Sequence, residues 1–258
     1  MKMKCFVVFL VLFPLVLNGQ PHHHGQVLVL TEGQGQHKPM SDAAIKWLVD
    51  ESVTLDFSLQ VMRSPNYLDR PGALDEFDLI IQLDYPPYAW NEGAARNFVQ
   101  YIEEGRGGWI GFHHASLLGE FDGFPMWEWF SNFLGGIRYQ NYIADLADGV
   151  LEIEAREHPI MEGVPASFII PDDEWYIYDR SPREAVEVLA SVDEDSYCPA
   201  SEIRMGDHPV VWTNPRVKAR NVYFQIGHSP LLYSNPHFTR MLHNALVWML
   251  GEADASPR

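Results

Sequence analysis

The sequence is poor in cysteine, in positive charge and in long apolar runs. Cys5 and Cys198 are its only cysteines. Cys5 precedes an N-terminal apolar run, so a chain that loses this run keeps Cys198 alone, which excludes an internal disulfide. Lys and Arg number 18 against 35 Asp and Glu, for a formal net charge of −17. Such an acidic chain repels nucleic acid, which excludes that partner and leaves neutral molecules and cations.

One long apolar run occurs, and it lies at the N-terminus. The segment "CFVVFLVLFPLVL" follows the two lysines of "MKMK" and precedes the small residue Gly19. This arrangement predicts a secretory signal peptide over residues 1–19, too short for a comfortable membrane span. A polar leader with three histidines follows over residues 20–25. We therefore expect a secreted or periplasmic protein with no membrane span after cleavage; an uncleaved anchor is the alternative.

The rest of the chain alternates predicted strands with predicted helices. Strands are predicted at 26–31, 55–61, 78–83, 108–113 and 221–229, with shorter ones near 150–155, 186–192 and 209–213. Helices are predicted to open at Ser41, Asn91 and Asn235. This alternation predicts a mostly parallel α/β sheet covered on both faces. We expect one domain over residues 26–251, followed by a tail at 252–258.

Polar side chains follow several of these strands. In a parallel sheet the carboxyl ends of the strands meet at one edge, where ligands bind. The residues at the predicted ends are Glu32, His37, Asp84, Tyr85, His113, His114, Ser116, His228 and Ser229. We expect them to converge, with one exception. In an extended chain His114 points away from the face of His113, which predicts a structural role for it.

A further polar segment is "PDDEWYIYD" at residues 171–179. Glu174 stands beside Trp175, and an apolar wall next to a carboxyl raises its pKa, as a general acid or base requires. A solvated turn with the aromatic residues tucked beneath it is the alternative interpretation.

His113 stands where a cysteine or serine would serve as an acyl-transfer nucleophile. A histidine there can move protons near neutral pH or bind a metal. Cys198 does not replace the nucleophile, because "DSYCPA" lacks a strand–turn–helix context. The alternative is a core histidine with both ring nitrogens hydrogen-bonded.

Six segments, in order, resemble the ThuA-like family of trehalose-utilisation proteins: "GRGGWIGFHHAS", "HPIMEGVP", "DDEWY", "HPVVWT", "NVYFQIGHS" and "NPHFTRMLHNALVWMLG". The resemblance covers residues 26–251. It implies an open, flavodoxin-like α/β fold similar to class I glutamine amidotransferases, without their cysteine nucleophile. It also implies a role in disaccharide catabolism, including pathways through 3-keto sugars. The family's motif residues correspond here to His37, His113, Asp173, Glu174, Tyr176 and His228.

Three functions fit these residues. The first is acid–base chemistry on a disaccharide or keto-sugar derivative, with His113 or Glu174 as the base. His228 and His37 would then polarise oxygens of the substrate. The second is metal-dependent hydrolysis, with a divalent transition metal bound by His37, His113, His228 and Glu174. The third is sugar binding without catalysis.

The expected partner is a small carbohydrate, and a homo-oligomer is compatible with the sequence. The residues predicted to bind substrate are Asp84, Tyr85, Asp173, Trp175, Tyr176 and Ser229. Aromatic side chains suit sugar binding, which draws attention to Trp127, Trp129 and Phe130 in an aromatic-rich insertion. No glycine-rich motif for a nucleotide cofactor is present.

Overall fold

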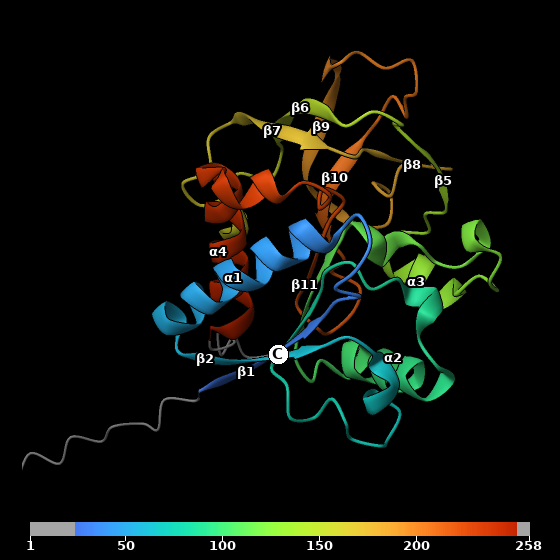
Figure 1. Cartoon of the computed structure of the whole chain (residues 1–258), viewed down its shortest axis with the longest axis vertical. Helices are drawn as coiled ribbons and strands as arrows, with labels where there is room; N and C mark the ends of the chain where they lie inside the picture. Colours follow the sequence, from blue (N-terminus) through green and yellow to red (C-terminus); the bar gives the residue numbers. More distant parts are fainter. Residues whose placement is uncertain (1–23, 252–258) are drawn as a thin grey trace, which may run out of the picture.

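The computed structural model describes residues 24–251, which form a nine-stranded sheet with helices on both faces (Figure 1). The strand order is β2-β1-β3-β4-β11-β10-β9-β6-β7. The strands of the first half are β1 (Gly25–Leu30), β2 (Phe57–Met62), β3 (Leu79–Gln82), β4 (Gly108–Phe112) and β11 (Asn221–Phe224). They pair in parallel, which confirms the predicted α/β sheet.

The second half of the sheet is antiparallel. Its strands are β10 (Pro209–Thr213), β9 (Glu187–Cys198), β6 (Ala147–Ile153) and β7 (Ser167–Asp173). A separate pair consists of β5 (Tyr139–Tyr142) and β8 (Tyr176–Tyr178). The sequence pattern does not predict β5, β7 or β8. For β5 the reason is plain, because "YQNY" has no alternation of apolar and polar residues.

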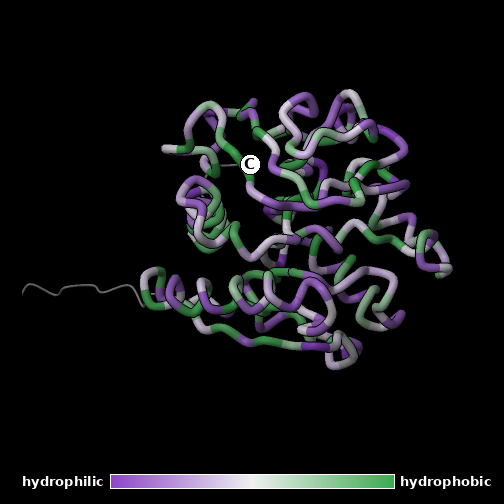
Figure 2. Tube along the Cα trace, turned by 45° about the horizontal axis from the view of Figure 1, so that its top comes forward, coloured by the Kyte–Doolittle hydropathy of each residue, from purple (hydrophilic) through white to green (hydrophobic). Residues whose placement is uncertain are grey.

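Two helices cover each face of the sheet. They are α1 (Lys38–Leu55) and α4 (Pro236–Leu250) on one face, and α2 (Glu92–Glu104) and α3 (Glu128–Phe133) on the other (Figure 1). Strand β1 shows why both faces need cover. Val27 and Val29 belong to the core under α1 and α4, whereas Leu28 and Leu30 belong to the core under α2 and α3. Hydrophobic and hydrophilic residues alternate along the helices, as expected of helices with one buried side (Figure 2).

Two predicted helix starts are confirmed. The side chain of Asn91 accepts a hydrogen bond from the backbone N–H of Ala94, and that of Asn235 accepts from His237 and Phe238. The start predicted at Ser41 is wrong, because α1 already begins at Lys38 with a proline in its first turn.

The predicted strand at 55–61 is also shifted. Leu55 is the last residue of α1, and Asp56 ends the helix with a left-handed φ of 54°. Strand β2 therefore begins at Phe57.

The predicted signal peptide, the leader up to residue 23 and the tail at 252–258 lie outside the described residues. Within residues 24–251, no helix has the length and apolar character needed to cross a membrane.

Candidate functional site

Strands β4 and β11 lie side by side in the centre of the sheet and position the site. They pair in parallel, with Phe224 opposite Phe112, so their carboxyl ends meet at one edge. His113 follows β4 directly, and His228 lies four residues beyond the end of β11. His37 lies between β1 and α1, and its ring centroid is 5.1 Å from that of His113 and 4.5 Å from that of His228. The predicted convergence of these loops is therefore confirmed.

His113 is held in an unusual conformation. Its φ is 38°, a left-handed value that costs a residue other than glycine about 1–3 kcal/mol. The surroundings compensate for this strain. Its ring is fully buried, stacks on Tyr176 at 4.0 Å, and lies with Nδ1 2.9 Å from the carbonyl oxygen of Gln225. The hydroxyl of Tyr223 donates to the backbone carbonyl of His113 at 2.9 Å.

His114 also belongs to the site, so the prediction that it points away is wrong. The chain stops being extended at His113 and enters a short 3-10 helix, η3 (His113–Ser116). Alternation of faces along a strand no longer applies there. The ring of His114 lies 3.9 Å from that of His37, and its Nδ1 lies 2.9 Å from the carbonyl oxygen of Asp84.

Glu174 completes the cluster from the antiparallel half of the sheet, directly after β7. Its Oε2 lies 3.1 Å from Nε2 of His113, and the side chain is 16% exposed. Burial raises the pKa of Glu174, and the nearby His228 and His114 oppose this shift. Below, "the histidine cluster" denotes His37, His113, His114 and His228 together with Glu174.

Trp175 does not form the predicted apolar wall beside Glu174. Its side chain is completely buried in the core under α1 and α4, and its Nε1 donates to the carbonyl oxygen of Ala147. This places Trp175 beyond the reach of a ligand. The raised pKa of Glu174 has the predicted direction, but general burial causes it.

Most of the other predicted substrate-binding residues are also buried, and three of them accept hydrogen bonds from backbone N–H groups of the loops. Asp173 accepts hydrogen bonds from the backbone N–H groups of Glu174, Gly227 and His228. Burial raises its pKa to about 7, against the effect of these hydrogen bonds. Asp84 accepts from the N–H of Glu32, and Ser229 accepts from Leu231. Tyr176 is 3% exposed and stacks on His113, whereas Tyr85 is half-buried.

The four histidines of the cluster favour their neutral form. Burial is the main cause that lowers the pKa of each, and in three of them neighbouring histidines add to the effect. A neutral imidazole carries one N–H and one lone pair. In His113 and His114, Nδ1 faces a backbone carbonyl and must therefore be the donor. Nε2 of each ring is then left with its lone pair.

This assignment places two acceptors opposite each other. Nε2 of His113 and Oε2 of Glu174 are 3.1 Å apart, and only a proton or a cation between them makes the contact favourable. In addition, Nε2 of His37 is buried and has no hydrogen-bond partner among residues 24–251. Both observations are typical of atoms arranged to bind a positive ion.

The cluster offers two sets of ligand atoms within 4.8 Å of one another. One set is His37, His113 and His114, and the other is His37, Glu174 and His228. Three neutral imidazoles with a carboxylate nearby suit zinc or a related transition metal. The carbonyls that accept from Nδ1 of His113 and His114 are the outer partners that fix metal-binding histidines in proteins. The residues therefore fit a divalent transition metal.

The aromatic residues of the insertion that were expected to bind a sugar mostly belong to the hydrophobic core. Phe130 is fully buried, and Trp127 and Trp129 pack against the same core. The ring of Trp129 is 6.0 Å from that of Phe98 in α2. The apolar spacing of a short amphipathic helix, α3, explains this insertion without a ligand.

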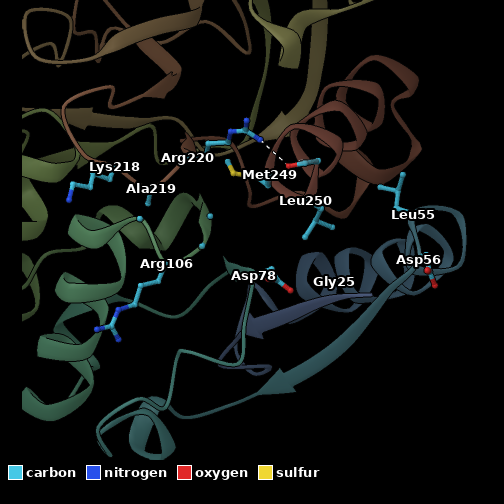
Figure 3. A pocket seen from close by; sticks show the side chains of 14 residues that line it. Gly25, Leu55, Asp56, Asp78, Arg106, Lys218, Ala219, Arg220, Met249 and Leu250 are labelled. Atoms are coloured by element: carbon cyan, nitrogen blue, oxygen red, sulfur yellow. Dashed lines mark hydrogen bonds between the residues drawn. The ribbon is translucent and has the colours of Figure 1, made fainter. Parts of the chain in front are cut away.

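A pocket of about 460 Å³ lies at the opposite edge of the sheet and contains none of the clustered histidines (Figure 3). Its arginines already have partners within the fold. Arg106 pairs with Asp75 and Glu104, and Arg220 donates to the carbonyl oxygens at the end of α4. Since open α/β sheets bind ligands at the carboxyl ends of their strands, the histidine cluster is the stronger candidate.

A second buried pair, His208 and Glu194, contacts the backbone of Tyr176, whose ring stacks on His113. The sequence analysis did not identify this pair. His208 lies with Nδ1 2.9 Å from Oε1 of Glu194 and with Nε2 2.9 Å from the carbonyl oxygen of Tyr176. Glu194 also accepts from the backbone N–H groups of Met205 and Gly206. Burial raises the pKa of Glu194, but these hydrogen bonds outweigh it and the net shift is downward.

We expect Glu194→Gln to lower the free energy of unfolding by roughly 2–3 kcal/mol at neutral pH, because hydrogen bonds to a buried charge are lost. A carboxyl whose folded pKa is depressed stabilises the fold above its unfolded pKa, here near 4.5, and loses this contribution as the pH falls through the folded pKa. The difference between wild type and variant in urea unfolding should therefore shrink below about pH 4.5. The exposed Glu202→Gln is the control. An equal difference at pH 7 and at pH 3 would contradict the assignment.

The fold as a whole is similar to that of class I glutamine amidotransferases. A glutamine amidotransferase from Thermotoga maritima superposes with a TM-score of 0.51 at 15% identity, over 89% of this chain and 100% of that chain. Residues 26–249 match the family model described as ThuA, trehalose utilisation, and the chain therefore belongs to the ThuA family.

Two solved ThuA-like proteins share most of the structure. The one from Bacteroides uniformis is 28% identical, with a TM-score of 0.78 over 90% of this chain and 94% of that chain. The one from Parabacteroides merdae is 18% identical, with a TM-score of 0.65 over 90% and 92%. No curated protein matches the chain in sequence.

Proposed function

We propose that the protein is a metal-dependent enzyme that transfers a proton on a neutral sugar derivative. The observation that carries the proposal is the pair of facing acceptors, Nε2 of His113 and Oε2 of Glu174, next to the unpartnered Nε2 of His37. A divalent transition metal bound by His37, His113 and His114 would use the lone pairs of both Nε2 atoms, and its charge would offset that of the adjacent Glu174 carboxylate.

A bound ion of this kind supplies a Lewis acid that polarises an oxygen of the substrate. The protein's own residues do the remaining work. Glu174 is the base, because it is the cluster's only carboxylate and is partly exposed. His228 is half-buried and stands on the same side, where it can hold a substrate hydroxyl.

Three considerations support a sugar as the substrate. The family is described by trehalose utilisation. The net charge of −17 disfavours anionic substrates such as phosphorylated sugars. A carbonyl-bearing sugar also has acidic C–H groups next to the carbonyl, which suit a carboxylate base. From the predicted signal peptide at residues 1–19 alone, we further propose that the protein acts outside the cytoplasm.

Metal content and solvent exchange test this function together. The full chain, with His22, His23 and His24 replaced by alanine to remove adventitious ligands, is purified without chelator and analysed for transition metals. We expect about one metal ion per chain. The loaded protein is then incubated with a 3-keto-disaccharide in D₂O, and we expect deuterium at the carbon next to the carbonyl.

The same experiment separates the alternatives. Cleavage of the sugar without deuterium exchange would show that the reaction is metal-dependent hydrolysis and not proton transfer next to the carbonyl. Exchange that survives complete removal of metal would leave acid–base chemistry by Glu174 and the histidines alone. Sugar binding with neither exchange nor cleavage would identify a non-catalytic binding protein.

A further inference from the structure

The loop between η3 and α3 exposes two aromatic side chains. Phe121 is 58% exposed and Phe124 is 48% exposed, although most aromatic residues of this region are core. The loop contains the short 3-10 helix η4 (Glu120–Asp122). Exposed phenyl rings lose hydrophobic stabilisation unless a ligand or partner covers them.

Phe121 is connected to the histidine cluster by an unbroken series of ring contacts. Its ring lies 4.6 Å from that of Tyr139, which lies 4.9 Å from Tyr176, which in turn stacks on His113 at 4.0 Å. Tyr139 is half-buried and lies close enough to Glu174 for that carboxylate to raise its pKa, although burial is the larger cause. The series therefore leads from the buried ring of His113, through the half-buried Tyr139, to the exposed ring of Phe121.

A second series of side chains starts on the other side of the cluster. Asp84 holds His114, and Tyr85 and Tyr88 follow it in the chain. The ring of Tyr88 stacks on that of Phe124 at 4.8 Å with an interplanar angle of 12°. Phe121 and Phe124 of one loop thus each contact a tyrosine ring, Tyr139 and Tyr88 respectively.

Two carboxylates lie among these rings. Burial is the largest cause that raises the pKa of Glu32 and of Tyr88, and it is the cause that raises the pKa of Asp122; the negative charge of Asp122 adds to the shift of Glu32, and both carboxylates add to that of Tyr88. Neither forms an ion pair with any residue in the described part of the chain. Their oxygens are therefore available to accept hydrogen bonds from hydroxyl groups.

The loop is held in one shape. Arg138 pairs with Glu120 at 2.8 Å and with Glu128 at 2.7 Å, on either side of the exposed rings. The N–H of Phe124 donates to the carbonyl of Gly119 at 2.9 Å. Gly119 has a φ of 128°, and a Cβ there would lie 2.4 Å from the carbonyl oxygen of Pro125. A rigid aromatic surface binds a ligand with little loss of conformational entropy.

We propose that Phe121, Phe124, Tyr139 and Tyr88, with Glu32 and Asp122, bind a second sugar ring of the substrate. The apolar C–H face of a sugar ring packs on aromatic rings, and its hydroxyl groups bind carboxylates. The inference rests on the proposed function, which places the first sugar ring of the substrate at the histidine cluster. It locates the second ring of a disaccharide, the kind of sugar that the family description already indicates, and it disfavours a free monosaccharide.

Calorimetry with sugars of one and two rings tests this inference. Zinc-loaded wild type and the double variant Phe121→Ala/Phe124→Ala are titrated with trehalose, maltose, cellobiose, sucrose and glucose. For the disaccharide that binds wild type most tightly, we expect the double variant to bind about tenfold more weakly, because a stacking contact is lost. Glucose binding and zinc content should not change. Tyr67→Ala is the control, because Tyr67 is 74% exposed and borders Gln60 and Arg70 of a separate pocket.

The outcomes separate this inference from the proposed function. Equal disaccharide affinity in wild type and double variant overturns the inference while leaving the metal site intact. Disaccharide binding that depends on Phe121 and Phe124 in protein that binds no metal supports the inference and overturns the metal-dependent function. If none of the four disaccharides binds the wild type, with or without zinc, the second-ring site is wrong.

Discussion

Replacing His114 with alanine is expected to weaken metal binding by more than about 100-fold and to abolish activity. Loss of even an outer partner of a metal ligand costs about 10–100-fold in affinity, and His114 presents a lone pair directly to the cluster. The structure also predicts that the fold survives, since His114 is only partly buried and follows the strand that ends at Phe112. Competition of zinc with a fluorescent chelator measures the affinity, and circular dichroism measures the fold.

The matched control for this variant is His237→Ala. His237 is exposed in the first turn of α4 and lies outside the cluster. It should leave zinc affinity and activity unchanged. Wild-type zinc affinity in the His114→Ala variant would show that His114 is a structural residue after all.

Glu174→Gln should reduce turnover by about 10²–10⁴-fold, the usual contribution of a positioned base. The amide keeps the size of the carboxyl but cannot accept a proton. His37, His113 and His114 remain as one complete set of ligand atoms, so zinc at saturating concentration should still bind. The measurement is the rate of deuterium exchange per bound metal. Loss of metal together with activity would show that Glu174 is a metal ligand. An unchanged rate of deuterium exchange would show that another residue is the base.

A conservative replacement adds a second readout. Glu174→Asp retains a carboxylate but shortens the side chain, and the contact with Nε2 of His113 is already 3.1 Å long in the wild type. We expect an exchange rate between those of wild type and Glu174→Gln. The unrelated carboxylate variant Glu202→Gln should match the wild type, because Glu202 is exposed and outside the cluster.

The sequence was sufficient to bring most residues of the candidate site together but not to predict their conformations and contacts. The rule that ligands bind at the carboxyl ends of parallel strands correctly brought His37, His113 and His228 together. It failed for His114, because the face to which a side chain points depends on the backbone of His113. A left-handed φ is uncommon in residues other than glycine, and the enrichment of histidine there is too weak to identify one position among eleven histidines.

The burial of individual side chains is a second feature that could not be predicted from the sequence. Trp175 and Asp173 flank Glu174, and both looked available for a ligand. In the structure Trp175 points into the core and Asp173 binds backbone N–H groups. These roles depend on the antiparallel half of the sheet, in which β7 was not predicted. The exposed rings of Phe121 and Phe124 were overlooked for the same reason, because the neighbouring Trp127 and Trp129 are equally aromatic but pack against the core.

The contact between His113 and Glu174 joins chain segments 61 residues apart, one from each half of the sheet. Residues 24–251 contain a single cysteine, Cys198, so no disulfide within this part of the chain connects the two halves. A metal ion bound by His113 would attract the carboxylate of Glu174 and so stabilise the contact between the two halves, since this arrangement exists only in the folded chain. Removing it should therefore lower the melting temperature of the antiparallel strands as well as that of the site. Metal supply would then set how long the folded protein persists, independently of any substrate it converts.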